Sequence, residues 1–206
     1  MVREPLEDLE RAALILMDYQ MGICRDGPEG PTLLSEQVKK RGVLGQVASC
    51  LRAARKAELP IIHVRLAFDE DYLLRSNRTE LFSRFEDNGL MRLGSEESEF
   101  CPESAPGEGE PVITKACIDP FIGTPLTQIL RVRGIETLFL GGVATNFVVE
   151  SAARHAADAG FAIEVVEDLC ASQSVQMHKF AIENILPTFG KVSAATEFMD
   201  MLRGGK

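Results

Sequence analysis

Two residues of opposite charge follow two predicted strands directly, and both can take part in proton transfer. Asp18 comes straight after the apolar run Ala12 to Met17, and Lys115 comes straight after the shorter run Pro111 to Thr114. The carboxyl ends of parallel strands meet at one edge of a sheet, where α/β enzymes keep their catalytic groups. A carboxylate and an ammonium group at that edge can hold each other ionised or set up a proton transfer. The same placement equally suits a salt bridge that only closes the edge of the sheet.

The rest of the chain alternates short apolar runs with longer amphipathic stretches, a pattern typical of βα units around a parallel sheet. Strands are predicted at Ala12 to Met17, Pro60 to Leu66, Pro111 to Thr114, Thr137 to Leu140, Ala162 to Val166 and Lys191 to Ser193. Helices are predicted at Leu44 to Ala57, Gly123 to Val132, Thr145 to Ala159, Met177 to Ile185 and Thr196 to Leu202. We therefore expect a single doubly wound α/β domain over residues 1–206, with its ligand crevice at the carboxyl ends of the strands.

Residues Phe68 to Glu110 do not follow this scheme, because they show no clear helical or strand period. Within them, Glu96 to Glu110 contains six glutamates, two prolines and two glycines, which is the composition of a loop. The composition predicts a mobile, solvated segment. The alternative is that this part of the chain crosses the active-site face and determines substrate specificity there.

The composition excludes several classes of function. Lys and Arg number 22 against 31 Asp and Glu, so the net charge is −9 and a nucleic-acid backbone would be repelled. The charge-free stretch 137–149 has 13 residues, too few to span a bilayer, and the N-terminal MVREPLEDLER contains no apolar leader segment. The five cysteines are odd in number and form no CxxC pair, which predicts reduced thiols. We expect a cytoplasmic protein that binds neither nucleic acid nor membrane.

Four segments carry a resemblance to a known family: LILMDYQMGIC (14–24), VITKACIDPFIGTPL (112–126), GIETLFLGGVATNFVVESAARHA (134–156) and VVEDLCAS (165–172). In this order they resemble the isochorismatase-like cysteine hydrolases, which include isochorismatase, nicotinamidase and several small amidohydrolases. The resemblance implies a six-stranded parallel sheet with helices on both faces. It also implies an active site built from an aspartate, a lysine and usually a cysteine, in which Asp18 matches the aspartate and Lys115 the lysine.

The resemblance breaks down at the nucleophile. In the family's motif the cysteine lies three residues after the threonine of GVAT, and Val148 holds that position here. A valine cannot form a thioester, so acyl transfer through a cysteine is not available at that position. The Val143 to Ala144 peptide falls where the family has a non-proline cis bond, which aims backbone N–H groups at a developing oxyanion.

Isochorismatase itself is similar in keeping the aspartate and the lysine without a cysteine. Its reaction, the hydrolysis of an enol ether, needs a proton delivered to carbon rather than a covalent nucleophile. The resemblance therefore implies a hydrolase of a small metabolite in which Asp18 is the general acid and Lys115 orients it or a substrate carboxylate. One alternative is a catalytically silent binding or assembly subunit of the same fold. Another is an amidohydrolase that uses a different thiol such as Cys117, two residues past Lys115 in a segment predicted to be extended.

Substrate binding is assigned to three further residues, Gln20, Arg65 and Phe147. An arginine such as Arg65 can hold a substrate carboxylate with two parallel hydrogen bonds. The small-molecule substrate is the partner that these residues imply.

Metal binding is not expected. The nicotinamidase branch of the family binds zinc through an Asp-x-His and a later His, whereas His63, His155 and His178 lack that spacing. We expect no cofactor either. Members of the family usually form homodimers or homotetramers, and the apolar residues near the C-terminus that could contact a second copy are Phe180, Ile182 and Ile185.

Overall fold

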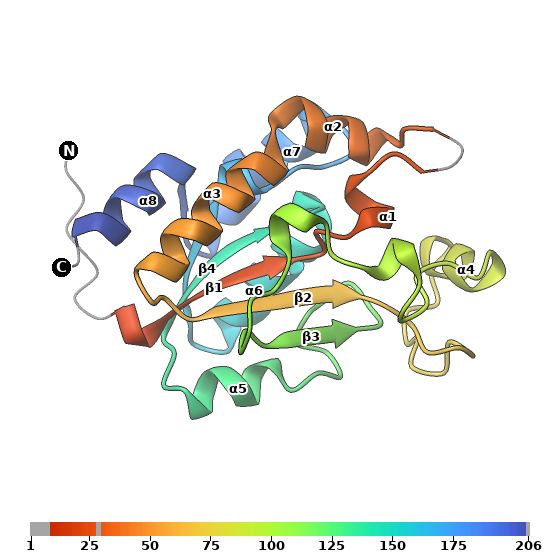
Figure 1. Cartoon of the computed structure of the whole chain (residues 1–206), viewed down its shortest axis with the longest axis horizontal. Helices are drawn as coiled ribbons and strands as arrows, with labels where there is room; N and C mark the ends of the chain where they lie inside the picture. The colour runs from red at the N-terminus through yellow and green to blue at the C-terminus, as the bar shows by residue number, and fades with distance from the viewer. Residues whose placement is uncertain (1–8, 28–29, 205–206) are drawn as a thin grey trace.

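The computed structural model describes residues 9–27 and 30–204, and the chain is built around a parallel sheet of six strands (Figure 1). The strands are β1 (Ala12–Met17), β2 (Ile61–Leu66), β3 (Val112–Lys115), β4 (Thr137–Gly142), β5 (Ala162–Val166) and β6 (Lys191–Ser193). Their order is β3-β2-β1-β4-β5-β6, and every neighbouring pair is parallel. The order reverses between β1 and β4, so the carboxyl ends of these strands form the switch point at which such sheets bind ligands.

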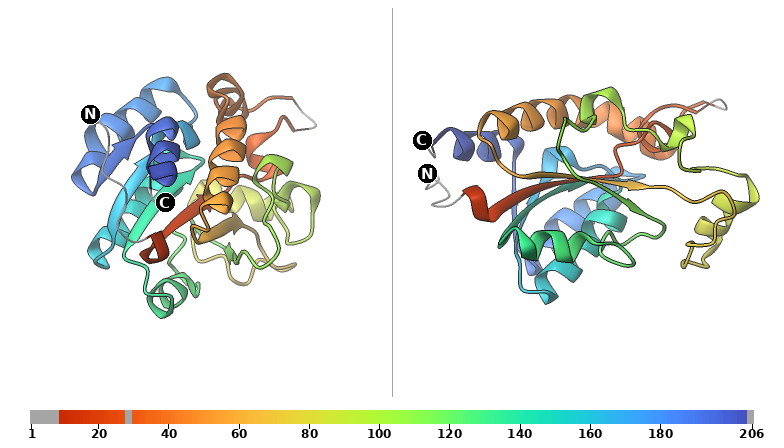
Figure 2. Two further views of the ribbon diagram at one scale, coloured as in Figure 1. Left: turned by 60° about the vertical axis from the view of Figure 1, so that its left-hand side comes forward. Right: turned by 60° about the horizontal axis from the view of Figure 1, so that its bottom comes forward.

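Helices cover both faces of the sheet, with α3 and α8 on one face and α5 and α6 on the other (Figure 2). The helices are α1 (Met21–Cys24), α2 (Leu33–Arg41), α3 (Val43–Lys56), α4 (Glu80–Asp87), α5 (Leu126–Val132), α6 (Glu150–Asp158), α7 (Val175–Phe180) and α8 (Ala195–Gly204). This arrangement confirms the predicted α/β fold with a six-stranded parallel sheet.

Alternate residues of β1 belong to two separate halves of the core. Leu14 and Leu16 pack in the cluster that includes α3 and α8, whereas Ile15 and Met17 pack in the cluster that includes α5 and α6. Successive side chains of a strand point to opposite faces, so a strand covered on both sides must be apolar throughout. All six residues of β1 are buried, which explains the continuous apolar run in the sequence.

Two predicted helices differ from the observed ones at their start. The helix predicted from Gly123 begins at Leu126, because Gly123 has a left-handed backbone (φ 68°) and Pro125 directly precedes the helix. The helix predicted from Thr145 opens with the π-helical turn Thr145–Val149 before α6.

Other elements lie where no helix is predicted. The sequence pattern did not indicate α1, α2 or α4, although α2 begins with a capping box between Thr32 and Ser35. The helix predicted at Met177 to Ile185 is observed as α7 followed by the π-helical turn Ala181–Ile185. Short 3₁₀ turns lie at Leu9–Arg11, Glu96–Ser98, Pro102–Ser104, Glu167–Leu169 and Leu186–Thr188.

The glutamate-rich segment 96–110 is anchored to the domain, so the expectation of a solvated segment is wrong for its central part. Ser98, Cys101 and Ser104 are buried. The backbone N–H of Cys101 and the hydroxyl of Ser104 donate to the Tyr19 carbonyl, at 2.9 and 3.0 Å. The small buried side chains between the glutamates are what pack this segment onto the turn after β1.

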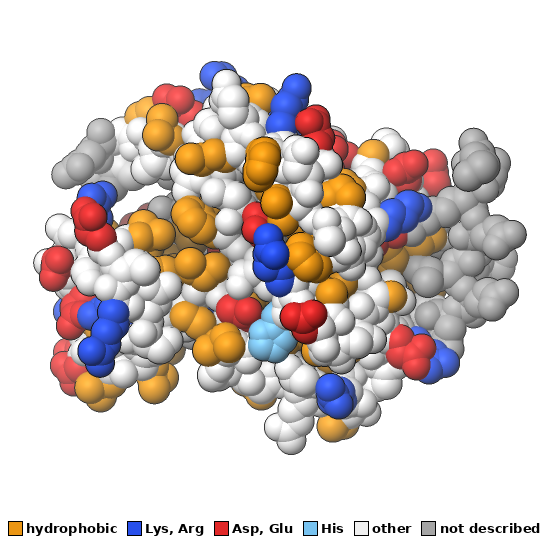
Figure 3. Space-filling view, turned by 180° about the vertical axis from the view of Figure 1, so that it is seen from behind, with side chains coloured by type: hydrophobic (Ala, Val, Ile, Leu, Met, Phe, Trp, Pro, Cys, Tyr) orange, Lys and Arg blue, Asp and Glu red, His pale blue; other side chains and the backbone are white. Residues whose placement is uncertain are grey.

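On the face opposite that of Figure 1, hydrophobic side chains occur in small groups between charged ones (Figure 3). Of the three apolar residues considered as contacts with a second copy, Phe180 is exposed, Ile185 is half-buried and Ile182 is buried in the core. Ile182 is therefore a packing residue. Among the described helices none is both long and apolar enough to cross a membrane. The expectation that the N-terminal MVREPLEDLER contains no apolar leader segment concerns mostly residues 1–8. These lie outside the described residues.

Candidate active site

Asp18 and Lys115 meet at the carboxyl edge of the sheet, as their positions after β1 and in β3 predict. The Lys115 ammonium lies 2.9 Å from Asp18 Oδ2, and both residues are almost fully buried. The ammonium also donates to the Cys117 carbonyl at 2.9 Å. The Asp18 backbone N–H donates to the Val64 carbonyl, and its backbone is left-handed (φ 63°), so the chain turns sharply after β1 and leaves the carboxyl at the strand end.

The two oxygens of the Asp18 carboxyl have different surroundings. Oδ2 is bound by Lys115, whereas Oδ1 is buried with no hydrogen-bond partner among the described residues. Burial raises the pKa of Asp18 above its ordinary value, and the charge and hydrogen bond of Lys115 oppose this rise without cancelling it. A carboxyl in this state can carry a proton closer to neutral pH than an exposed aspartate can.

Asp18 and Lys115 line a small cavity of about 140 Å³ whose other walls are mostly apolar. Among the described residues, the one other polar side chain that lines it is that of Gln173, just before α7. The remaining lining residues are Ile23, Leu34, Leu66, Leu81, Phe82, Phe85, Ile118, Val143, Ala144, Phe147 and Val148. The turn after β4 therefore forms one wall and α4 another.

The turn after β4 holds Val148 against this cavity. The Val143–Ala144 peptide is cis, and the Val143 N–H donates to the Met17 carbonyl at 3.2 Å. Val148 lies on the π-helical turn and is 1% exposed. The end of β4 packs closely on Leu169 because Gly141 has no side chain: a Cβ there would lie 2.7 Å from Leu169 Cβ.

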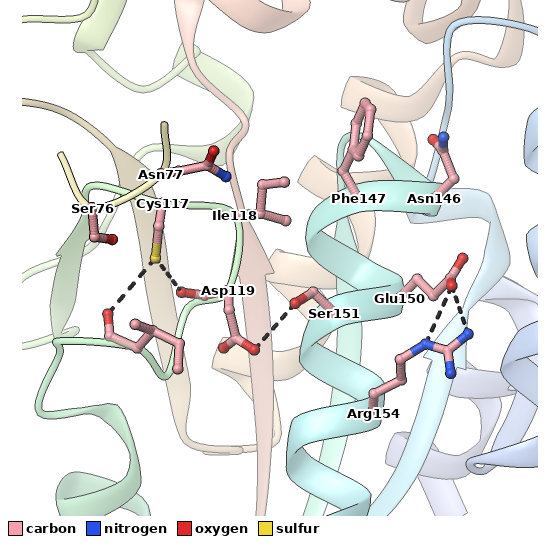
Figure 4. A pocket seen from close by; sticks show the side chains of 11 residues that line it. Ser76, Asn77, Cys117, Ile118, Asp119, Asn146, Phe147, Glu150, Ser151 and Arg154 are labelled. Atoms are coloured by element: carbon pink, nitrogen blue, oxygen red, sulfur yellow. Dashed lines mark hydrogen bonds and ion pairs between the residues drawn. The ribbon is translucent and has the colours of Figure 1, made fainter. Parts of the chain in front are cut away.

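Cys117 faces a different cavity. Its thiol lies 3.3 Å from the Asp119 carbonyl and lines a more open cavity of about 490 Å³, walled by the loop after β3 and the start of α6 (Figure 4). Burial raises the pKa of the Cys117 thiol. The prediction that the segment after Lys115 is extended is wrong, because the chain bends at residues 116–118, and Cys117 does not line the Asp18 cavity. Ile118 and Phe147 lie between the two cavities and line both.

Comparison with known proteins identifies the family of this chain. The sequence profile of the isochorismatase domain matches residues 12–197. This chain belongs to the isochorismatase family. It is 31% identical over 192 residues to YecD, an uncharacterized isochorismatase family protein of Escherichia coli O157:H7, a match that covers 92% of this chain and 95% of YecD.

Solved structures of the isochorismatase family have the same fold. An isochorismatase family protein from Burkholderia thailandensis superposes with a TM-score of 0.79 at 28% identity, covering 98% of this chain and 100% of that one. A cysteine hydrolase from Pseudomonas syringae pv. phaseolicola 1448A gives a TM-score of 0.86 at 21% identity, covering 100% of this chain and 98% of that one. The predicted isochorismatase-like fold is thereby confirmed.

Of the three residues predicted to bind substrate, the structure brings only Phe147 to the cavity. The Gln20 amide is fully used in the fold: it donates to the carbonyls of Leu66 and Ser98 and accepts from the Leu66 N–H, each at 2.8 Å. The Arg65 guanidinium donates to Thr114 Oγ1 and lies over the Phe100 ring, 6.0 Å from its centroid. Neither lines the Asp18 cavity, because Gln20 joins β2 to segment 96–110 and Arg65 extends across β3.

The histidines are separated from one another. His63 contacts Glu110, His155 contacts Asp119, and His178 contacts Thr145. In the part of the chain that the structure describes, no group of three His, Cys, Asp or Glu side chains could hold a metal ion.

The wall that α4 contributes to the cavity was not predicted from the sequence. Phe82 and Phe85 of α4 line the cavity and contact each other edge to face, with ring centroids 5.6 Å apart. They are three residues apart, which places them on one side of a helix. The spacing is informative only once a helix is known at 80–87, and the surrounding stretch has no clear period.

Proposed function

We propose that this isochorismatase-family protein hydrolyses a small metabolite by acid–base chemistry at Asp18 and Lys115, without a covalent thiol intermediate. The observation that carries the proposal is the Asp18 carboxyl: its Oδ1 is buried and unpaired among the described residues, and Asp18 lines a cavity together with Lys115. A free carboxyl oxygen in an apolar cavity suits proton transfer to a bound substrate.

The cavity lining supports the absence of a covalent step. No Cys, Ser or Thr is among the residues that line the Asp18 cavity in the described part of the chain. Val148, which the resemblance to the family assigns to the cysteine's position in the motif, is part of the wall. Hydrolysis at this site then depends on a proton donor and a positioned water molecule.

Hydrolysis of an enol ether fits these groups. The protonated Asp18 carboxyl gives its proton to the vinyl carbon, the double-bond electrons form the new C–H bond, and the adjacent carbon becomes an oxocarbenium ion. The Asp18 carboxylate then takes a proton from water as the water oxygen bonds to that carbon. The resulting hemiketal loses the alcohol and leaves a ketone. Lys115 holds Oδ2 throughout, which leaves Oδ1 as the oxygen that gives and takes the proton.

The size and lining of the cavity limit the substrate. A volume of about 140 Å³ is below the roughly 300–1,000 Å³ of sites for drug-sized ligands. Three aromatic rings, those of Phe82, Phe85 and Phe147, form part of its walls. The substrate is therefore expected to be small, with an apolar or unsaturated ring.

The test is a hydrolysis assay on a panel of enol ethers, including isochorismate, and of small amides. For any substrate turned over, Asp18→Asn is expected to lower kcat/KM by roughly 10²-fold or more, as removal of a general acid does. Asp71→Asn removes an exposed carboxylate outside the cavity and serves as the matched control. Unchanged turnover by Asp18→Asn, or loss of turnover in Cys117→Ser, would contradict the proposal. Binding without turnover by the wild type would favour a silent binding subunit.

A further inference from the structure

Gln173 is a polar residue of the Asp18 cavity that the proposed proton transfer does not use. It lies in the segment between β5 and α7, is half-buried, and lines the cavity among mostly apolar residues. A few polar groups placed in an apolar wall are what orients a small ligand and determines specificity.

The backbone on both sides of Gln173 is fixed by hydrogen bonds. Before it, the Ala171 carbonyl accepts from the Thr145 N–H of the turn after β4 at 2.7 Å. After it, the Ser174 hydroxyl accepts from the Met177 N–H at 3.1 Å and caps α7. Gln173 is therefore held in place relative to the turn that forms one wall of the cavity.

The two ends of the Gln173 amide have different surroundings. Its Oε1 lies 3.0 Å from the hydroxyl oxygen of Ser172, which is fully buried and donates to it. That hydroxyl shares its one hydrogen with Asn146 Oδ1, on the side of the larger cavity. The Gln173 amide nitrogen has no hydrogen-bond partner among the described residues. Ser172 thus takes the acceptor end of the amide and leaves its two N–H donors for a ligand.

The other polar groups that line the cavity are donors too, once Asp18 carries the proton that the proposed reaction requires. A lysine ammonium has three hydrogens, and those of Lys115 that go to Asp18 Oδ2 and to the Cys117 carbonyl leave one unused. The acid form of Asp18 adds an O–H donor. A ligand that satisfies this set has to offer acceptors, which a carbonyl or carboxylate oxygen does with two lone pairs.

We propose that Gln173 is a specificity-determining residue, whose amide nitrogen donates to a carbonyl or carboxylate oxygen that the substrate carries apart from the bond that Asp18 protonates. This assignment rests on the proposed function in taking the Asp18 cavity as the substrate site. A substrate without that oxygen leaves the amide nitrogen unpaired beside an apolar ligand, and unpaired polar groups are the means by which a site rejects an analogue.

Three probes that share a six-membered ring test the binding step: benzoate, benzamide and toluene. Toluene has no oxygen, and the other two separate a charged acceptor from a neutral one. Isothermal titration calorimetry compares each probe between the wild type and Gln173→Leu. The affinity of benzoate, of benzamide or of both should fall by roughly three- to tenfold in the variant, as the loss of one hydrogen bond implies. Toluene should bind the variant at least as tightly as the wild type.

Two further variants separate the amide from a general effect on the wall. Gln176→Leu is the matched control, because Gln176 is an exposed glutamine of α7 that does not line the cavity, and it should leave all three affinities unchanged. Gln173→Glu replaces the donor by a carboxylate, which only accepts. It should weaken benzoate more than Gln173→Leu does, because the two negative charges repel each other.

Three binding results would overturn the role of Gln173. These are equal affinities of the wild type and Gln173→Leu for both benzoate and benzamide, a loss of toluene affinity as large as theirs, and no binding of either oxygen-bearing probe to the wild type. An equal loss for toluene would mean that the side chain only supports the wall.

Turnover distinguishes a failure of this assignment from a failure of the proposed function. For an enol ether that the wild type hydrolyses, Gln173→Leu should lower kcat/KM by roughly tenfold if the ring carries a carboxylate, and by less than about twofold for the analogue without it. A preference that is the same in Gln173→Leu and the wild type, with turnover still lost in Asp18→Asn, would overturn the role of Gln173 and leave the hydrolase standing. Probe binding that depends on Gln173 in a protein that hydrolyses none of the panel would support the binding role and contradict the hydrolase.

Discussion

At the scale of single residues, the charge of Lys115 has two effects on Asp18. It fixes the carboxyl through Oδ2, and it limits the rise in the pKa of Asp18 that burial causes. The two effects can be separated by experiment, because a substitution that removes the charge changes the pKa of Asp18 even where it also slows the reaction.

The first prediction concerns the pH profile of the proposed reaction. The acid form of Asp18 delivers the proton, so kcat/KM falls as pH rises through the pKa of Asp18. Lys115 lowers that pKa, so Lys115→Met should move the descending limb to higher pH. Lys115→Arg keeps the cation and should leave the limb close to its wild-type position. A limb that stays in place or moves to lower pH in Lys115→Met would show that this charge does not act on the titrating group.

The second prediction concerns the wall position Val148. Val148→Cys replaces the valine by a smaller side chain that carries a thiol, in the wall of the cavity that Lys115 also lines. We expect the variant to fold and to hydrolyse small amides at least roughly tenfold faster than Val148→Ala, because a thiol supplies the nucleophile that the wild-type cavity does not contain. Val148→Ala is the matched control for lost volume. Equal amidase rates in the two variants would mean that Val148 is not at the nucleophile position of a working site.

At the scale of elements, the strands and their ends were predictable from the sequence, whereas the walls of the cavity were not. Asp18 could be placed because β1 is buried on both faces and is therefore a continuous apolar run with a clear end. Lys115 could be placed because it closes the short run of β3, an edge strand in which exposed and buried residues alternate. The directions of side chains beyond those ends depend on turns: the bend at 116–118 directs Cys117 into the other cavity, and Gln20 is turned towards Leu66. The helix α4 lies in a stretch without a clear period, so its contribution required the structure.

The third prediction tests the close packing of the end of β4, at Gly141, against Leu169 and Tyr19. A Cβ at Gly141 would lie 2.7 Å from Leu169 Cβ and 2.8 Å from Tyr19 Oη, and both neighbours are buried. Gly141→Ala should therefore lower the free energy of unfolding by about 1–3 kcal/mol, as overpacking of a core does.

The control for this substitution is Gly45→Ala. Gly45 lies within α3, and a Cβ there would meet nothing within 4 Å. Alanine is the better helix former, so this variant should gain about 0.5–1 kcal/mol. Urea unfolding followed by circular dichroism measures both. A Gly141→Ala variant as stable as Gly45→Ala would mean that the end of β4 has room to move away from Leu169.

At the scale of the whole molecule, one half-buried carboxylate, that of Glu110, joins three parts of the chain. Glu110 accepts hydrogen bonds from Arg55 of α3 at 2.7 and 2.9 Å and from the Gly107 N–H at 2.7 Å, and it contacts His63 of β2 at 2.7 Å. Burial alone would raise the pKa of Glu110, but these hydrogen bonds, with that of Arg55 first, lower it to about 2. Burial lowers the pKa of His63.

Both shifts make the folded protein less stable in acid. The folded-state pKa of Glu110 is below its ordinary 4.5, so its contribution is complete above that value and is lost as pH falls towards about 2. The unfolded chain also protonates His63 before the folded chain does, so stability falls as pH drops below the ordinary histidine value of 6.5. Asp18 acts in the opposite direction: its raised pKa stabilises the fold below 3.8 and this contribution is lost as pH rises through the folded-state value.

The fourth prediction is that Glu110→Gln makes the free energy of unfolding depend less on pH in the acidic range. The variant should lose roughly 1–2 kcal/mol near pH 7, because solvent around the half-buried carboxylate weakens its charged hydrogen bonds, and this difference from wild type should shrink below about pH 4 as the wild-type carboxylate is protonated. Glu80→Gln removes an exposed carboxylate paired with Arg84 and should change stability by less than about 1 kcal/mol at any pH. Urea unfolding across this pH range gives both curves. A constant difference between Glu110→Gln and wild type would mean that Glu110 stabilises the fold by packing, because only an ionised, hydrogen-bonded carboxylate loses its contribution on protonation.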